Sequence, residues 1–250
     1  MKMLMICLVL LWHGEALIAV GMRDARLALQ RGCPGDALEL YLGIMSGGRD
    51  DAAVWYGVAR AQFALDRLVL SALACDAAIV RDGTHQGALV LRGRVRTAQH
   101  RFPEAIRDFE SALILRPDDG YVCALLARVL ARQGRRSESY RYHERAAGTL
   151  PPDPERMLGA AWAAAAIERW GDAEIWCRRA GLAGAGKTRL ALLVPRIQLR
   201  LADGERRGGR LDQARERLER LTQDWPRAEE AVTARQQLAA LRTLIAGARR

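Results

Sequence analysis

The same kinds of residue return every 34 positions along this chain of 250 residues. Four registers show the repetition over four consecutive units. They are Trp55, Leu89, Cys123 and Met157; Ala59, Gly93, Ala127 and Ala161; Cys75, Phe109, His143 and Cys177; and Ala78, Ala112, Ala146 and Ala180. Agreement of four registers over four units is very unlikely by chance. A fixed period of this length predicts stacked supersecondary units that bury one continuous core.

The clearest unit covers residues 86–119. Small residues at Gly93 and Ala105 allow two helices to approach closely, and Phe109 fills the space between units. Pro117 ends the second helix, because proline cannot continue one. This pattern resembles the tetratricopeptide repeat, a helix–turn–helix unit of the same length. The resemblance implies an all-α fold, a right-handed α-solenoid of about six such repeats.

The register predicts about thirteen helices when it is carried along the chain. The expected repeats are 18–51, 52–85, 86–119, 120–153, 154–187 and 188–228. The sixth repeat fits if the loop GERRGGR adds seven residues, and Pro195 then falls inside its first helix. Residues 227–250 are expected to form a capping helix, because a stack must cover its open end. The apolar residues expected to cover the last repeat are Ala231, Val232, Leu238, Leu241 and Leu244.

Residues 1–21 differ from the rest of the chain. Lys2 precedes the apolar run MLMICLVLLW, and small residues follow up to Gly21, as in a secretory signal. The run is too short to span a bilayer as a stable helix, and Cys7 lacks the small preceding residues of a lipoprotein site. Two interpretations stay open: a signal or membrane anchor, or an apolar helix packed on the first repeat. The first predicts a periplasmic or membrane-associated protein, the second a cytoplasmic one.

The formal net charge of +10 favours acidic partners, anionic membranes or nucleic acid without choosing among them. Five cysteines are scattered without a CxxC pair, which argues against a disulfide framework or a zinc site. They are Cys7, Cys33, Cys75, Cys123 and Cys177. Neither the cysteines nor the four histidines show a spacing typical of catalysis. We therefore expect no enzymatic activity, no metal and no cofactor.

Residues 181–188 read GLAGAGKT and match the phosphate-loop pattern GxxxxGK[ST]. Nucleotide binding through such a loop needs a strand before it and a helix after it. The preceding AEIWCRRA is expected to be the second helix of the fifth repeat, and 62 residues follow Thr188. We interpret the motif as a glycine-rich turn between repeats, and nucleotide binding is the weaker alternative.

A row of arginines is the most informative functional signal. It occupies the ninth position of successive repeats, which in tetratricopeptide repeats faces the concave groove. Neighbouring groove positions add aromatic rings. The predicted groove residues are Arg26, Tyr56, Arg60, Phe63, Arg94, Tyr121, Arg128, Trp162 and Arg196. Guanidinium forks pair with carboxylates and rings supply apolar contact, so the row predicts a scaffold that binds an extended acidic segment of a protein partner.

Other interpretations of the arginine row exist. It could be a solvated basic face, or it could bind the phosphates of a nucleic acid. Asp and Glu are interspersed, as in RDFE and RYHERA, which makes a nucleic acid the less favoured partner. The signal-like start, together with an excess of Arg over Lys that is typical of a GC-rich genome, resembles bacterial envelope proteins of this family that assist pilus or secretion-system assembly. Membrane association would come through the N-terminal apolar segment.

Overall fold

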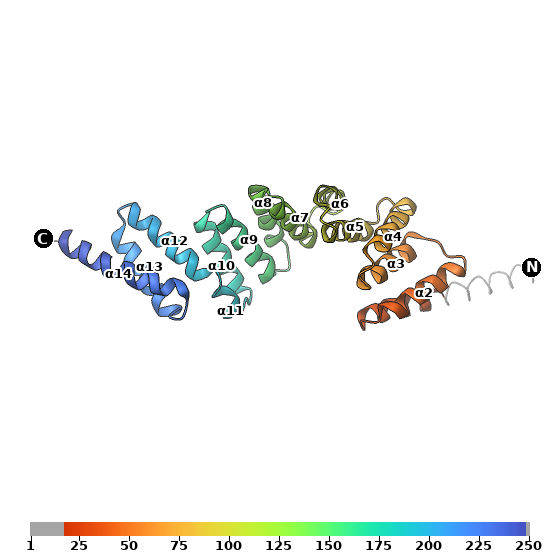
Figure 1. Ribbon diagram of the computed structural model, residues 1–250, viewed down its shortest axis with the longest axis horizontal. Helices are drawn as coiled ribbons and strands as arrows, with labels where there is room; N and C mark the ends of the chain where they lie inside the picture. Colours follow the sequence, from red (N-terminus) through yellow and green to blue (C-terminus); the bar gives the residue numbers. More distant parts are fainter. Residues whose placement is uncertain (1–17, 249–250) are drawn as a thin grey trace, which may run out of the picture. The chain divides into compact units, whose positions relative to one another are not determined.

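The computed structural model describes residues 18–248, and this part of the chain is helical with short turns (Figure 1). Residues 18–30 form the first helix. The others are α2 (Pro34–Ser46), α3 (Ala52–Ala64), α4 (Leu68–Arg81), α5 (Gln86–Ala98), α6 (Phe102–Leu115), α7 (Gly120–Arg132), α8 (Arg136–Ala147), α9 (Pro154–Ala166), α10 (Trp170–Leu182), α11 (Lys187–Leu190), α12 (Val194–Arg207), α13 (Leu211–Asp224) and α14 (Glu229–Ala248). The described residues therefore hold fourteen helices, and no strand occurs among them. The additional helix relative to the prediction is the short α11.

The chain divides into two compact units, residues 1–117 and 118–250. The described part of the first unit holds the helix 18–30 and α2 to α6, and that of the second holds α7 to α14. Consecutive helices pack in pairs within each unit, α3 with α4 and α5 with α6 in the first, α7 with α8 and α9 with α10 in the second. The predicted all-α fold of stacked helix–turn–helix units is confirmed.

The turn inside each helix pair repeats with the same spacing as the core. One residue in each turn has a left-handed backbone, with φ between 57° and 78°. In the first five helix pairs these residues are Gly32, Asp66, His100, Gly134 and Glu168, each 34 positions after the last. The next amide donates to a carbonyl five residues earlier, as Arg101 N does to Arg96 O at 2.8 Å. This hydrogen bond ends the first helix in a Schellman-type turn, so the turn keeps its geometry even where the residue is not glycine.

The repeating apolar positions form the core. Ala78, Ala112, Ala146 and Ala180 are fully buried at one register of four successive units. Three cysteines are also buried at repeat positions, and burial raises the pKa of the Cys75 and Cys177 thiols to about 12. These thiols therefore stay protonated and pack as small apolar side chains. Cys33 is exposed, and Cys7 lies outside the described residues.

The chain departs from the predicted spacing between α10 and α12. α12 begins at Val194, not near Thr188, and Pro195 lies in its first turn. Proline is tolerated there because the first-turn N–H has no partner within the helix. The additional residues therefore lie within 183–193, which include α11, and not in the loop GERRGGR, whose first residues belong to α12. Arg196 accordingly lies near the start of α12 and not at its ninth position.

The last helix, α14, packs on α13 and α12. Ala231, Leu238 and Leu241 are buried as predicted for a capping helix. Val232 and Leu244 are exposed, each 56% accessible, and do not cover the last repeat as predicted. Both point away from the buried stripe that these three residues form on one side of the helix.

No helix within residues 18–248 has the length and apolar character needed to cross a membrane. Residues 1–17, which hold most of the signal-like segment, lie outside the described part. The signal and anchor interpretation of residues 1–21 therefore stays a prediction.

Candidate functional site

Arginines and aromatic rings of the predicted groove lie together in the first unit. Arg60 and Tyr56 are one turn apart on α3, with the guanidinium carbon 5.8 Å from the centroid of the ring. Arg94 on α5 lies over Phe63 of α3 at 4.7 Å. A cation over an aromatic face is attracted to the ring's negative quadrupole. These contacts hold guanidiniums from α3 and α5 beside half-buried rings of α3.

Arg26 extends this cluster to the helix 18–30. The side chain of Tyr41 on α2 is buried, which raises the pKa of its hydroxyl, while the positive charges of Arg60 and Arg26 oppose that rise. Both guanidiniums are therefore near the same phenol. We call Arg26, Tyr56, Arg60, Phe63 and Arg94 the Arg–aromatic face. None of its three arginines forms an ion pair within residues 18–117.

A second row of arginines has the same spacing but a different environment. Its members stand at the N-caps of successive second helices: Arg67, Arg101, Arg135 and Arg169. The last three each pair with the carboxylate three residues further on, Glu104, Glu138 and Asp172. These pairs neutralise one another at the surface and contribute little to stability. Periodic arginines alone therefore do not define a site; the Arg–aromatic face stands out because its charges have no carboxylate beside them.

Tyr121 and Arg128 lie on α7 in the second unit, and both side chains are exposed. The positive charge of Arg128 affects the pKa of His143 on α8. Burial and, to a smaller extent, the charge of Arg128 lower the pKa of that imidazole to about 4. The imidazole is thus neutral at physiological pH and packs against Gly159 of α9. His143 therefore adds no charge to this side of α7.

Trp162 and Arg196 line one cleft of about 770 Å³ in the second unit. We call it the α9–α12 cleft, after the helices that carry these two residues. Five further basic or aromatic side chains that line it were not predicted: Arg136, Trp170, Arg200, Arg207 and Arg210. The repeat register could not reveal them, because all five lie at helix ends or in the shifted α12. The available signal was the spacing of Arg196, Arg200 and Arg207, which places them on one side of a helix.

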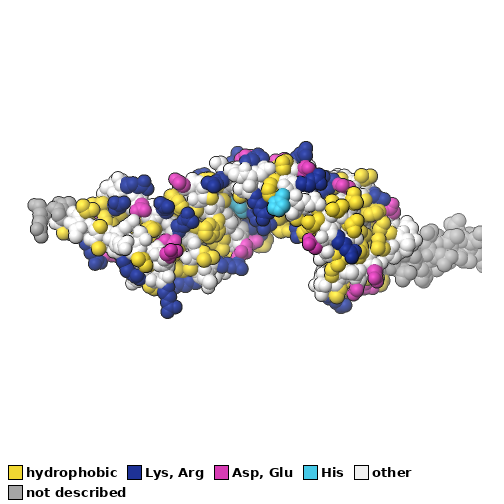
Figure 2. Space-filling model, in the orientation of Figure 1, with side chains coloured by type: hydrophobic (Ala, Val, Ile, Leu, Met, Phe, Trp, Pro, Cys, Tyr) yellow, Lys and Arg dark blue, Asp and Glu magenta, His cyan; other side chains and the backbone are white. Residues whose placement is uncertain are grey.

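Most of the positive charge belongs to the second unit. Residues 118–250 carry 25 Lys and Arg against 17 Asp and Glu, while residues 1–117 carry 14 against 12. Figure 2 shows basic side chains spread over the visible surface, with fewer acidic ones between them. The first unit is therefore nearly neutral, and its Arg–aromatic face is a local concentration of charge.

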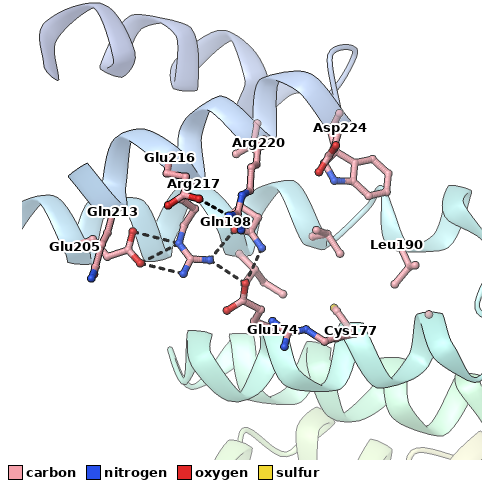
Figure 3. A pocket seen from close by; sticks show the side chains of 16 residues that line it. Glu174, Cys177, Leu190, Gln198, Glu205, Gln213, Glu216, Arg217, Arg220 and Asp224 are labelled. Atoms are coloured by element: carbon pink, nitrogen blue, oxygen red, sulfur yellow. Dashed lines mark hydrogen bonds and ion pairs between the residues drawn. The ribbon is translucent and has the colours of Figure 1, made fainter. Parts of the chain in front are cut away.

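A pocket of about 600 Å³ lies between α10, α12 and α13 (Figure 3). Arg217 donates to Glu205 at 3.0 Å, to Glu174 at 2.8 Å and to Gln198 at 2.7 Å. Burial raises the pKa of Glu174, but hydrogen bonds from Gln198 and Arg217 outweigh that effect and hold it below its usual value. The polar side chains satisfy one another, so this network ties three helices together.

The GLAGAGKT motif lies beside this pocket. Its first two residues end α10, Gly184 turns the chain with a φ of +98°, and Lys187 and Thr188 begin α11. A helix, not a strand, precedes the glycines, so the strand–loop–helix arrangement of a nucleotide site is not formed. The pocket also carries the carboxylates of Glu174, Glu205, Glu216 and Asp224. These carboxylates disfavour a phosphate ligand.

Replacing Lys187 with alanine should change the free energy of unfolding by less than about 1 kcal/mol. Lys187 is exposed, and its ammonium lies 5.4 Å from the ring centroid of Trp225. Urea unfolding of the two proteins measures this difference. Thermal shift with Mg-ATP should show no stabilisation of either protein. An ATP-dependent shift that the substitution abolishes would show that the motif is a nucleotide site.

Comparison with known proteins finds proteins built of tetratricopeptide repeats. Residues 90–154 match the model of the tetratricopeptide repeat. The structure of pilF from Pseudomonas aeruginosa is similar over 90% of this chain and 99% of its own, with a TM-score of 0.67 and 17% identity. YrrB, described as a TPR protein with an unusual peptide-binding site, matches over 78% and 97%, with a TM-score of 0.60 and 17% identity. TTC0263, a thermophilic TPR protein of Thermus thermophilus, matches over 74% of this chain and 98% of its own, with a TM-score of 0.57 and 16% identity.

The chain has the fold of a helical-repeat protein, which is what likeness at such low identity establishes. Residues 90–154 match the tetratricopeptide repeat family, and the 34-residue period extends the spacing of that repeat along the chain. No curated protein matches its sequence. Proteins of this family are generally non-enzymatic interaction scaffolds. Within the described residues, no group of three or more His, Cys, Asp or Glu is placed to hold a metal ion.

Proposed function

We propose that this chain is a non-enzymatic scaffold that binds an extended, acidic segment of a protein partner. The observation that carries the proposal is the Arg–aromatic face of the first unit. Arg60 and Arg94 lie over aromatic rings, and none of the three arginines of the face pairs with a carboxylate within residues 18–117. A carboxylate can pair with both arms of a guanidinium, and the adjacent rings supply apolar contact area. This combination suits acidic side chains that alternate with apolar ones.

A nucleic acid is the alternative ligand. A polyanion needs a continuous track of positive charge, whereas the first unit is nearly neutral. Its surface carries acidic residues such as Asp50, Asp66 and Glu110 among the basic ones. The local charge of the face therefore favours a short run of carboxylates over a long run of phosphates.

We also propose that the chain acts at a bacterial cell envelope, in the assembly of an envelope complex. The support is the N-terminal sequence, with Lys2 before an apolar run and small residues up to Gly21. Such a segment would act as a secretory signal or hold the protein at a membrane. Fractionation of cells, with mass spectrometry of the mature N-terminus, tests this part. A cytoplasmic protein that keeps residues 1–21 would contradict it.

The binding proposal is tested by capturing partners from a lysate, identifying them by mass spectrometry, and titrating one by calorimetry at two salt concentrations. Arg26→Ala, Arg60→Ala and Arg94→Ala should each weaken binding, by about 2–5 kcal/mol for a desolvated contact and less at the rim. Arg→Lys should also weaken it, because lysine lacks the planar fork.

Arg107→Ala on α6 is the matched control, since this exposed arginine lies outside the face. Equal losses from Arg107→Ala and from the face variants would mean that only diffuse charge matters. In that case, tighter binding of an oligonucleotide would favour the nucleic-acid alternative.

A further inference from the structure

The α9–α12 cleft concentrates guanidinium groups that have no acidic partners. Arg196, Arg200 and Arg207 follow one side of α12, and all three are exposed. None of them forms an ion pair with a carboxylate in the described part of the second unit. Like charges at this spacing repel each other, so the arrangement costs stability in the free protein and suits a bound anion.

Arg210 is a further arginine of the cleft, and no acidic residue stands three positions after it to form an ion pair. It stands at the N-cap of α13, the position that Arg135 and Arg169 occupy on earlier second helices. Those two arginines pair with an acidic residue three positions on, whereas Gln213 stands three positions after Arg210. Arg210 therefore lines the cleft without a carboxylate from its own helix.

Two tryptophans give the cleft an apolar side. Trp162 on α9 is 43% accessible, and Trp170 begins α10 with the guanidinium carbon of Arg200 5.9 Å from its ring centroid. The acidic side chains that line the cleft are Glu168 and Glu205, and Arg217 already binds Glu205. The positive charge thus remains in large excess beside exposed aromatic surface.

We infer that the α9–α12 cleft is a second binding site, separate from the Arg–aromatic face, for a short peptide segment with adjacent carboxylates next to an apolar side chain. The excess of guanidiniums requires more than one negative charge, and the tryptophans require apolar surface on the ligand. A volume of about 770 Å³ fits a few residues. The inference rests on the proposed role as a peptide scaffold but not on the residues of the first unit.

The site takes a peptide better than a nucleic acid because the surface next to it is not continuously basic. Asp212, Glu216 and Glu219 on the neighbouring α13 are exposed and pair with Arg215, Arg220 and Arg242. These arginines are already paired, so the surface beside the cleft offers no continuous row of free positive charge to the phosphates of a nucleic acid. A short acidic segment ends before it reaches this surface.

Fluorescence anisotropy tests the inference on the full chain. The probe is a labelled peptide with three glutamates followed by leucine, and its matched control has glutamines in their place. Only the glutamate peptide should bind. Arg196→Ala with Arg200→Ala should weaken its binding by about tenfold or more, and Trp162→Ala should also weaken it. Arg206→Ala is the control, because Arg206 lies on the same helix, pairs with Asp203 and is not part of the cleft.

Binding at the α9–α12 cleft must also be independent of the Arg–aromatic face. In the background of the triple variant Arg26→Ala, Arg60→Ala and Arg94→Ala, Arg196→Ala with Arg200→Ala should still weaken binding of the probe by about tenfold or more. Disappearance of that effect in the triple-variant background, or an equal loss from Arg206→Ala alone, would overturn the inference. So would tighter binding of oligo-dT or of phosphatidylglycerol vesicles than of the peptide. Loss of probe binding in Arg196→Lys with Arg200→Lys, while helical circular dichroism stays unchanged, supports recognition by the guanidinium fork. If the probe does not bind but the captured partner still depends on the Arg–aromatic face, the proposed function stands and this inference fails.

Discussion

Replacing Asp108 with alanine should lower the free energy of unfolding by about 2–4 kcal/mol. The carboxylate of Asp108 on α6 is 3% exposed and accepts hydrogen bonds from Arg92 and Arg96 of α5, each at 2.7 Å. Arg92 also pairs with Asp76 of α4 at 2.6 Å. Burial lowers the pKa of Arg92, but the two aspartates outweigh that effect, and its pKa is raised overall. Removing Asp108 leaves two largely buried guanidiniums without their shared partner.

Urea unfolding followed by circular dichroism measures this effect. Asp76→Ala is the matched control, because the Asp76 side chain is 49% exposed and water can replace its contact. Asp76→Ala should lower the free energy of unfolding by no more than about 1 kcal/mol. Asp108→Asn keeps the size of the side chain but loses the charge, so its cost should fall between the two. Equal losses of unfolding free energy in Asp76→Ala and Asp108→Ala would show that burial of Asp108 does not increase its contribution to stability.

The fold could be predicted because the same apolar pattern occurs in several successive repeats. A period in the apolar positions reports which residues must face one another, and the alanines at 78, 112, 146 and 180 are all fully buried. The start of α12 could not be predicted from the register, because an insertion has no period. Pro195 was the local signal, since it favours the first turn of a helix over the interior.

The candidate site was only partly visible in the sequence. The spacing predicted Arg60, Arg94 and the rings of Tyr56 and Phe63 as groove residues. It did not predict which guanidinium lies over which ring, because those contacts depend on side-chain orientation. Spacing also could not separate this row from the N-cap arginines, which share the period. The difference is the acidic residue that stands three positions after an N-cap arginine, as Glu104 does after Arg101. The cleft around Arg200 and Arg210 depends on the shifted α12, so the register could not reveal it.

Replacing Gly93 with alanine should destabilise the protein by about 1–3 kcal/mol, although alanine favours a helix over glycine. A Cβ atom at Gly93 on α5 would lie 2.6 Å from Cε1 and 2.9 Å from Cζ of Phe109 on α6. The Phe109 ring is 1% exposed and cannot move aside without disturbing the core. Phe109→Ala alone should cost more, about 3–5 kcal/mol, because it leaves a cavity. Both costs are measured by urea unfolding.

The double variant separates steric conflict from a general weakening of the helix pair. Phe109→Leu removes the ring edge that a Cβ at residue 93 would meet, so Gly93→Ala with Phe109→Leu should cost less than the sum of the single changes, by about 1 kcal/mol. Gly43→Ala on α2 is the matched control, since a Cβ there meets no atom within 4 Å. It should be neutral or stabilising by up to about 1 kcal/mol. Strict additivity of the first pair, or a loss of stability at Gly43, would mean that the contact between Gly93 and the Phe109 ring does not set the spacing of α5 and α6.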